Sequence, residues 1–208
     1  MLVLKDAGLV YLANPKTAGR ALRLALEPFA VPVALGNAGR HIPAQVYQRE
    51  WRALIEDELG RPPETFAVMR EPRAHMESWF RFRQRDRMRG HSRSTHAASF
   101  ADFVEDRLSD NPPDHARIGR QDLFLGFGRR GVPVTHVFDY ARLDLLLDFL
   151  AERLGQRLVL PVVNVSPPLP EGSLDLPEDL EARYRRVHRP EFALYDRVAR
   201  DGVLVTRP

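Results

Sequence analysis

The sequence predicts an α/β fold with a central parallel sheet flanked by helices. Short apolar runs at residues 9–13 and 65–69 each lead through a polar loop into a segment with helical apolar spacing. Units of this kind, repeated along a chain, form parallel strands joined by right-handed crossovers. The chain has 208 residues, and no linker rich in Pro, Gly or Ser divides it. We therefore expect one domain over residues 1–208, with a sizeable core.

The composition restricts the kinds of site that the chain can build. No cysteine is present, which excludes disulfides, thiolate catalysis and cysteine-bound metal. The formal charge of +3 suits an anionic ligand but does not by itself indicate nucleic acid, and we expect no nucleic-acid partner. No apolar run reaches the roughly 18 residues of a membrane span, so we expect no stable membrane insertion. A first strand near residue 9 leaves no room for a signal peptide, which favours a cytoplasmic location.

The loop at residues 14–19 connects the first strand to the first helix. Backbone N–H groups at a helix N-terminus lack intrahelical partners, and the helix dipole adds positive charge there. Lys16 adds an ammonium group, Thr17 adds a hydroxyl donor, and Gly19 permits close approach of a phosphate-like group. The alternative is an ordinary strand-to-helix connection with a surface lysine.

The next elements follow from turn residues and apolar spacing. Pro28 and Pro32 end the first helix, and residues 31–35 form a candidate short strand. A helix is expected over residues 43–59, with Pro43 in its first turn and Gly60 after its end. Residues 65–69 form the second buried strand, and a helix begins at Pro72.

Arginine is unusually frequent between residues 81 and 93. Alternate spacing spreads side chains around a helix, so these arginines do not form one stripe. We expect a solvated helix end that runs into a loop at residues 90–98. A positive rim for an anionic substrate is the alternative.

The remaining chain contains one more strand and several helices. Ser99 is an expected N-cap for a helix over residues 100–108, and Pro112 and Pro113 follow its end. The other expected elements are a short helix at 121–127, a strand at 134–138, and helices at 143–154, 178–187 and 191–200.

The loops at 14–19 and 70–72 lie at the same edge of the predicted sheet, where ligands of such sheets bind. A Walker P-loop needs a lysine near the end of a glycine-rich loop, followed by Ser or Thr. Here Lys16 precedes the single Gly19, and Arg20 and Ala21 follow it. A magnesium-dependent nucleotide triphosphatase is therefore poorly supported.

The ordered motifs resemble the sulfotransferase family, most closely the branch with bacterial and Golgi carbohydrate sulfotransferases. The motifs are PKTAG after the first strand, Arg70-Glu71-Pro72 after the second, and Ser78 eight residues beyond Arg70. Further matches, in the family's order, are QDLFL at 121–125, the strand at 134–138 with its leucine-rich helix, LPVVNVS at 160–166 and FALYD at 192–196. The resemblance covers most of the chain and implies a three-layer, P-loop NTPase-like fold.

The resemblance also implies a donor, 3′-phosphoadenosine 5′-phosphosulfate (PAPS), which leaves as 3′,5′-adenosine bisphosphate (PAP). The residues that would wrap the 5′-phosphosulfate are Pro15, Lys16, Thr17, Ala18, Gly19 and Arg20. Arg70 and Ser78 would hold the 3′-phosphate, Arg70 by charge-assisted hydrogen bonds. Ser78 falls two turns into the following helix, so both groups can face one cleft. No metal is implied.

Sulfuryl transfer would proceed by in-line attack of an acceptor hydroxyl on sulfur, with the acceptor possibly a carbohydrate. Lys16 would neutralise charge on the leaving oxygen, and loss of such a donor costs on the order of 3 kcal/mol. His41 is the candidate general base, with a helix-capping role as the alternative. His75 is the weaker rival for the base. His91 and His96 lack nearby carboxylates in their loop, which argues against a metal pair.

Two departures from the family pattern leave other functions open. Arg20 and Ala21 stand where the family usually carries hydroxyl donors. Asn164 and Ser166 match a family motif near the active site, and a Pro-terminated loop explains them as well. The alternatives are a P-loop-type nucleotide-dependent kinase and a non-catalytic protein that binds a nucleotide or polyanion. The acceptor pocket is expected in variable loops at residues 33–42 and 85–98.

Overall fold

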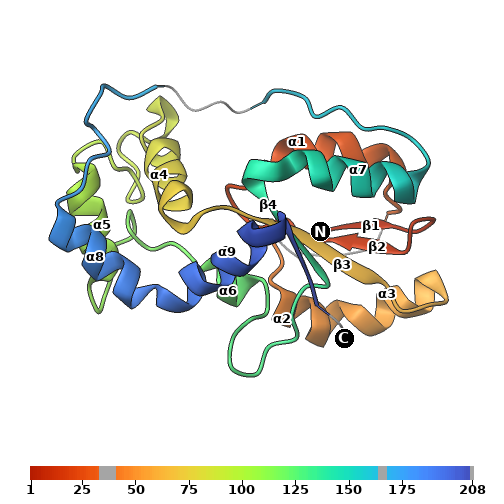
Figure 1. Ribbon diagram of the computed structural model, residues 1–208. Coiled ribbons are helices and arrows are strands. Elements are labelled where there is room, and N and C mark those ends of the chain that lie inside the picture. The colour runs from red at the N-terminus through yellow and green to blue at the C-terminus, as the bar shows by residue number, and fades with distance from the viewer. Residues whose placement is uncertain (33–40, 164–167, 207–208) are drawn as a thin grey trace.

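A five-stranded mixed sheet lies at the centre of the computed structural model, which describes residues 1–32, 41–163 and 168–206 (Figure 1). The strands lie in sequence order: β1 (Leu2–Leu4), β2 (Leu9–Tyr11), β3 (Glu64–Met69), β4 (His136–Asp139) and β5 (Val203–Val205). β2, β3 and β4 are parallel, whereas β1 and β5 pair antiparallel at the two edges.

The expected parallel sheet is therefore found only at the centre, and the structure is mixed because both edge strands are antiparallel. β1 is joined to β2 by a tight turn in which the Gly8 N–H donates to the Lys5 carbonyl at 3.0 Å. A connection that short permits only antiparallel pairing. β5 follows Gly202 directly after the last helix and runs back along β4. The parallel core of β2, β3 and β4 agrees with the prediction.

One face of the sheet is covered by α1 (Gly19–Leu26) and α7 (Leu143–Leu154), which lie together above it in Figure 1. Side chains alternate between the two faces of a strand. Leu9 and Tyr11 of β2 and Phe66 and Val68 of β3 point to this face, where Leu22, Leu146 and Leu150 pack against them.

The opposite face is covered by the helical segment after residue 43 and by α9 (Arg189–Asp201). This segment comprises α2 (Ala44–Val46), a π-helical turn (Tyr47–Trp51) and α3 (Arg52–Leu59). Val10, Ala67 and Val137 of the sheet pack here against Ile55 and Val198. Helices on both faces of the sheet confirm the α/β class.

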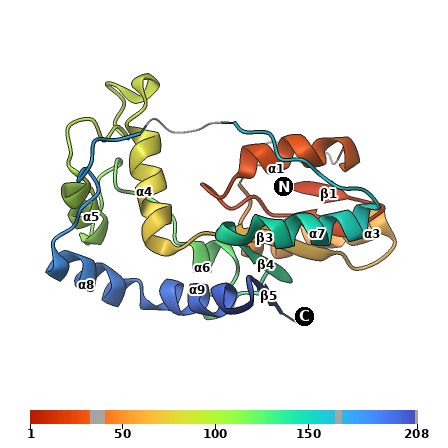
Figure 2. The same cartoon turned by 45° about the horizontal axis from the view of Figure 1, so that its top comes forward.

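A helical extension lies beside the sheet, on the left in Figure 1 and again in Figure 2. It consists of α4 (Pro72–Arg83), α5 (Phe100–Leu108) and α8 (Glu178–Val187), with the start of α9. A separate apolar cluster holds it together, and its centre includes Phe80, Phe100, Phe103, Leu180 and Tyr184. α4 follows the carboxyl end of β3, so this extension lies next to the edge of the sheet where the parallel strands end.

The predicted helices agree closely with the structure. Those at 100–108, 143–154 and 178–187 have the predicted bounds, and Ser99 forms a capping box with Asp102. The short helix at 121–127 is only α6 (Gln121–Phe124). Of the strand expected at 31–35, Val31 forms an isolated bridge to Val3, and residues 33–40 lie outside the described part. None of the described helices has the length and apolarity to cross a bilayer.

Candidate anion-binding site

The loop between β2 and α1 has a strained backbone. Lys16 and Ala18 have φ angles of 67° and 59°, a region that costs a non-glycine residue about 1–3 kcal/mol. Two hydrogen bonds stabilise this shape. The Thr17 hydroxyl donates to the Asn14 carbonyl at 2.8 Å, and His75 Nε2 on α4 donates to the Pro15 carbonyl at 3.0 Å. Strain of this kind, held by the surrounding fold, is typical of functional sites.

The same loop presents backbone N–H groups to an anion. Ala18 is the N-cap of α1 and provides no side-chain cap. The first bond of the helix runs from the Leu22 N–H to the Ala18 carbonyl, so the N–H groups of residues 19–21 have no acceptor within the helix. Alternating signs of φ before a helix turn successive N–H groups into a concave anion-binding surface. The helix dipole adds positive charge at this point.

Lys16 is the side chain at the centre of this surface. Its Nζ lies 4.2 Å from the centroid of the Phe82 ring and 5.8 Å from that of Trp79. Burial and the positive charges of Arg85, Arg70, Arg81 and Arg87 together lower the Lys16 pKa to about 7. Within the described ranges, no carboxylate lies within ion-pair distance of Lys16. A bound anion would supply the missing negative charge.

Arg70, directly after β3, is the second cation of the site. Its guanidinium lies 4.6 Å from the ring centroid of Tyr140, which follows β4. Its Nε is buried without a hydrogen-bond partner, and it forms no ion pair in the part of the chain that the structure describes. The carboxyl ends of all three parallel strands therefore contribute to one site: the loop after β2, Arg70 after β3 and Tyr140 after β4.

The side chain of Gln121, the first residue of α6, joins two of these strand ends. Its Nε2 donates to the Arg70 carbonyl at 2.8 Å, and its Oε1 accepts from the Arg70 N–H at 3.0 Å. The same Oε1 accepts from Asn14 Nδ2 at 3.0 Å, and Asn14 also donates to the Val68 carbonyl. Gln121 is 1% exposed. This buried carboxamide therefore sets the position of Arg70 relative to the loop.

Ser78 lies on the face of α4 that is turned toward the loop. Residues three, four or seven positions apart share one face of a helix. His75 contacts Pro15 and Phe82 contacts Lys16, and Ser78 lies between them in this register. Ser78 is half-buried and forms no hydrogen bond with another described residue. Its hydroxyl is therefore open to a ligand.

One expectation about this loop is corrected by the structure. Thr17 is fully buried and its hydroxyl donates a hydrogen bond to the Asn14 carbonyl, so it is not a free donor. A Cβ added at Gly19 would lie 3.8 Å from Tyr11 Oη, an ordinary contact, so the packing of the protein itself does not require glycine there. Arg20 is exposed and has no hydrogen bond to a described residue.

The two histidines proposed as bases have different surroundings. His75 is buried, and burial together with the positive charges of Arg70 and Lys16 lowers its pKa to about 3. Its Nε2 donates to the Pro15 carbonyl and so positions the loop, and this burial leaves it poorly placed to contact an acceptor that enters from solvent. His41 is exposed and its Nδ1 donates to the Ala13 carbonyl at 2.7 Å, which leaves Nε2 open as an acceptor. Asn164 and Ser166 lie outside the described residues.

The arginines after Phe80 are divided between two roles. Arg83 is buried and donates to the carbonyl oxygens of residues 114, 115 and 117, which makes it structural. Arg85 and Arg87 follow the end of α4, and their guanidinium groups lie 5.0 and 5.1 Å from the Phe82 centroid. Phe82 also contacts Lys16, so Arg85 and Arg87 lie beside the candidate site, where the alternative of a positive rim would place them. Arg87 is exposed, which agrees with the expected solvated helix end.

The sequence does not reveal Gln121 and Tyr140 as parts of the site, and it indicates His75 only as a rival base and not as a residue that positions the loop. Gln121 begins the motif at 121–125, but nothing local indicates a partner 107 residues away. His75 lies three residues before Ser78, and this spacing indicates that both side chains face the loop.

No match was found in a scan against models of known protein families, in a search of curated proteins or in a search of solved structures. The geometry of the site is therefore the basis for a proposed function.

We predict that Lys16 titrates near neutral pH. The chain has only two lysines, Lys5 and Lys16, so a spectrum of protein labelled with ¹³C at lysine Cε contains two signals. The Lys16 signal should move with a midpoint of about 7, because burial and the neighbouring arginines disfavour its charged form. Added sulfate should raise the midpoint, since a bound anion stabilises the ammonium.

A Lys5→Arg variant assigns the signals and is the matched control. Sulfate affinity should fall as pH rises through the Lys16 midpoint, because the free site then loses its proton. In Lys16→Arg, which keeps a charge at all these pH values, affinity should stay constant. A Lys16 midpoint at the ordinary value of about 10.4 would contradict the proposed environment.

We also predict that Gln121→Ala destabilises the fold. The substitution leaves the Arg70 backbone groups unpaired in a buried position, which should reduce the free energy of unfolding by about 2–4 kcal/mol. Denaturant unfolding measures this loss. Gln45→Ala, an exposed site on α2, is the control and should change stability by less than about 0.5 kcal/mol. Equal effects of the two substitutions would rule out the bridging role of Gln121.

Proposed function

We propose that the protein is a sulfotransferase that moves a sulfuryl group from PAPS to an acceptor hydroxyl, on a carbohydrate, glycolipid or small molecule. The observation that carries the proposal is the excess of positive charge around the α1 N-terminus: Lys16 has four arginines near it and no ion pair with a described carboxylate. A P-loop NTPase-like fold and a cytoplasmic location belong to the same proposal.

The donor has two anionic groups at opposite ends of its ribose, and the site has two matching sets of donors. In this proposal the loop at residues 15–20 wraps the 5′-phosphosulfate, which accepts from the backbone N–H groups of residues 16–20 and from the Lys16 ammonium. Arg70 and the open Ser78 hydroxyl bind the 3′-phosphate, with charge-assisted hydrogen bonds from Arg70. The Gln121 bridge supports this assignment because it sets the spacing between the two sets of donors.

The transfer itself is an in-line displacement at sulfur. The acceptor oxygen forms a bond to sulfur while the bond from sulfur to the phosphate oxygen breaks, and PAP leaves. Negative charge grows on that phosphate oxygen, and the Lys16 ammonium next to it would stabilise the transition state. Anion binding raises the low pKa of Lys16, so the residue would be charged when the donor is bound. Positioning and electrostatics supply most of the rate, as in phosphoryl transfer.

His41 is the proposed general base. Its Nδ1–H is used by the Ala13 carbonyl, at the beginning of the loop that carries Lys16. The free Nε2 lone pair can therefore take the proton of the acceptor hydroxyl as the new bond forms. The exposure of His41 agrees with an acceptor that enters from solvent.

A non-catalytic binder of the same fold is the second candidate. The side chains of Arg20 and Ala21 contain no hydroxyl, so neither supplies the hydroxyl donor that the family pattern places after the glycine. Donor binding would then rest on backbone N–H groups, Lys16 and the arginines. A P-loop-type kinase fits less well, because no Ser or Thr follows Gly19 to hold magnesium.

We expect PAP to raise the melting temperature without added metal, and to do so less in Lys16→Ala. Ligand at about 100 times its dissociation constant stabilises the folded state by about 2.7 kcal/mol, which a thermal shift detects. Lys5→Ala is the control and should respond like the wild type. A response to ATP with magnesium but none to PAP would contradict the sulfotransferase proposal and favour a kinase.

We predict that His41→Ala lowers sulfuryl transfer from PAPS to a panel of hydroxyl acceptors by about 10²–10⁴-fold. PAP should still shift the melting temperature of this variant, because His41 contacts the acceptor and not the donor. Full turnover in His41→Ala would exclude His41 as the base. PAP binding by the wild type without transfer to any acceptor would support the non-catalytic binder.

A further inference from the structure

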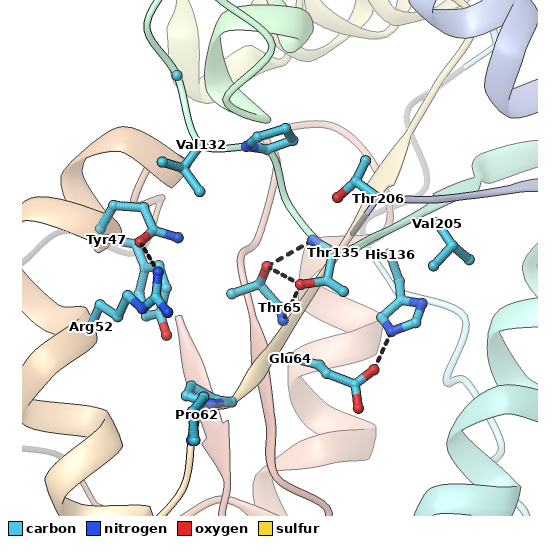
Figure 3. A pocket seen from close by; sticks show the side chains of 14 residues that line it. Tyr47, Arg52, Pro62, Glu64, Thr65, Val132, Thr135, His136, Val205 and Thr206 are labelled. Atoms are coloured by element: carbon cyan, nitrogen blue, oxygen red, sulfur yellow. Dashed lines mark hydrogen bonds and ion pairs between the residues drawn. The ribbon is translucent and has the colours of Figure 1, made fainter. Parts of the chain in front are cut away.

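A cavity of about 450 Å³ opens beside the first residues of β3 and β4 (Figure 3). Tyr47 and Arg52, from the helical segment after residue 43, form one side, and Pro62 lies below. Val132 and Val205 come from the loop before β4 and from β5. The volume is in the range of small-molecule sites in proteins.

This cavity is separate from the anion-binding site. Glu64 and Thr65 at the start of β3 line it, whereas Arg70 follows the other end of the same strand. At about 3.3 Å per residue, the length of β3 separates the two places by roughly 17 Å. A small molecule in the cavity therefore cannot contact Lys16 or take part in chemistry there.

The charged groups at the cavity are already balanced. Glu64 accepts from His136 and Arg153, both at 2.5 Å. Burial raises the Glu64 pKa, but the hydrogen bonds and charges of Arg153 and His136 outweigh it and lower the pKa overall. Arg52 donates to Glu56 at 2.8 Å and to Gln48 at 3.2 Å. In contrast to Lys16, both Glu64 and Arg52 already have charged partners, so neither favours binding of an ion.

The threonine hydroxyls at the cavity are also used within the fold. The Thr135 N–H donates to Thr65 Oγ1 at 2.9 Å, and the Thr65 N–H donates to Thr135 Oγ1 at 3.1 Å, as Figure 3 shows. Thr206 donates its hydroxyl to the Val134 carbonyl at 2.9 Å. The Thr65 and Thr135 hydroxyls also lie 3.2 Å apart, so one donates to the other. The apolar part of the lining consists of Pro62, Pro63, Val132, Pro133 and Val205.

The wall around Val132 is held in place by a close backbone crossing. A Cβ added at Gly131 would lie 2.1 Å from the Gly126 carbonyl oxygen, and one at Gly126 would lie 2.2 Å from that of Val132. Only glycine fits at such a distance. The cavity is therefore built into the fold.

Tyr47 provides the unused polar group. It is 1% exposed, and its hydroxyl has no hydrogen-bond partner within the described ranges. Burial raises its pKa to about 12, so it stays a neutral donor. It begins the π-helical turn Tyr47–Trp51, and π turns are frequent at functional sites. A ligand oxygen that bonds to Tyr47 would satisfy a buried group that otherwise costs free energy.

We propose that this cavity is a second binding site, for an uncharged and mainly apolar ring compound that carries one hydroxyl or carbonyl oxygen for Tyr47. The apolar lining would bind the ring, and the balanced charges disfavour an anion. The proposal stands apart from the sulfotransferase assignment, because the two sites share no residue.

The probe is 2-naphthol at neutral pH, and the readout is the methyl NMR spectrum of valine-labelled protein. The signals of Val132 and Val205 should shift with saturation, while that of the exposed Val159 should not. Val132→Trp, at a 41% exposed position, fills the cavity and should weaken binding at least tenfold. Val159→Trp, at an 86% exposed position, is the matched control and should bind as the wild type does.

Two further comparisons test the stated chemistry. Tyr47→Phe keeps the ring and removes the donor, and should weaken 2-naphthol several-fold. Naphthalene-2-sulfonate should bind at this cavity at least tenfold more weakly than 2-naphthol. The proposal is overturned if 2-naphthol does not shift Val132 and Val205, if Val132→Trp or Tyr47→Phe binds it as tightly as the wild type, or if the sulfonate binds equally well. Folding of each variant is checked by its thermal unfolding and by the dispersion of the valine methyl signals outside the cavity.

Discussion

The carboxamide of Gln121 determines where the two cationic parts of the anion site stand. It binds both backbone groups of Arg70 and the side chain of Asn14, and so ties the end of β3 to the loop after β2. The N–H of Gln121 donates in turn to Glu191 at 2.9 Å, which links the site to α9. Because a buried amide can satisfy these groups only in one arrangement, the distance between Lys16 and Arg70 is set by the fold before any ligand binds.

The site holds unfavourable features that an anion would relieve. Lys16 combines a strained backbone with a buried ammonium among arginines, and both cost stability. His75 and Thr17 hold the loop in this shape through hydrogen bonds to carbonyl oxygens. A bound phosphate or sulfate would accept from the open N–H groups of α1 and neutralise Lys16. The rest of the fold therefore offsets the free-energy cost of the strained loop and its buried charge. Binding of an anion would remove part of that cost.

Local patterns were enough to predict the helices but not the polar bridges between elements. The apolar spacing in α7 and α8 is long and regular, so their bounds were correct. β1 and β5 have three residues each, as β2 does, but neither leads through a polar loop into a helix, which is the pattern that indicated β2. Lys16 and Arg70 were predictable because both follow buried strands. The partners of Gln121 come from distant parts of the chain, and the arginines past α4 meet Lys16 through a turn that helical spacing does not describe.

The spacing of the two cationic parts is tested most directly by the affinities of PAP and 5′-AMP for the wild type and for Arg70→Ala. The account predicts that the wild type prefers PAP by about tenfold or more, equivalent to about 1.4 kcal/mol for the extra phosphate. Arg70→Ala should lose this preference and still bind 5′-AMP at the loop as the wild type does. A preference for PAP that survives Arg70→Ala, or equal wild-type affinities for the two nucleotides, would contradict the account.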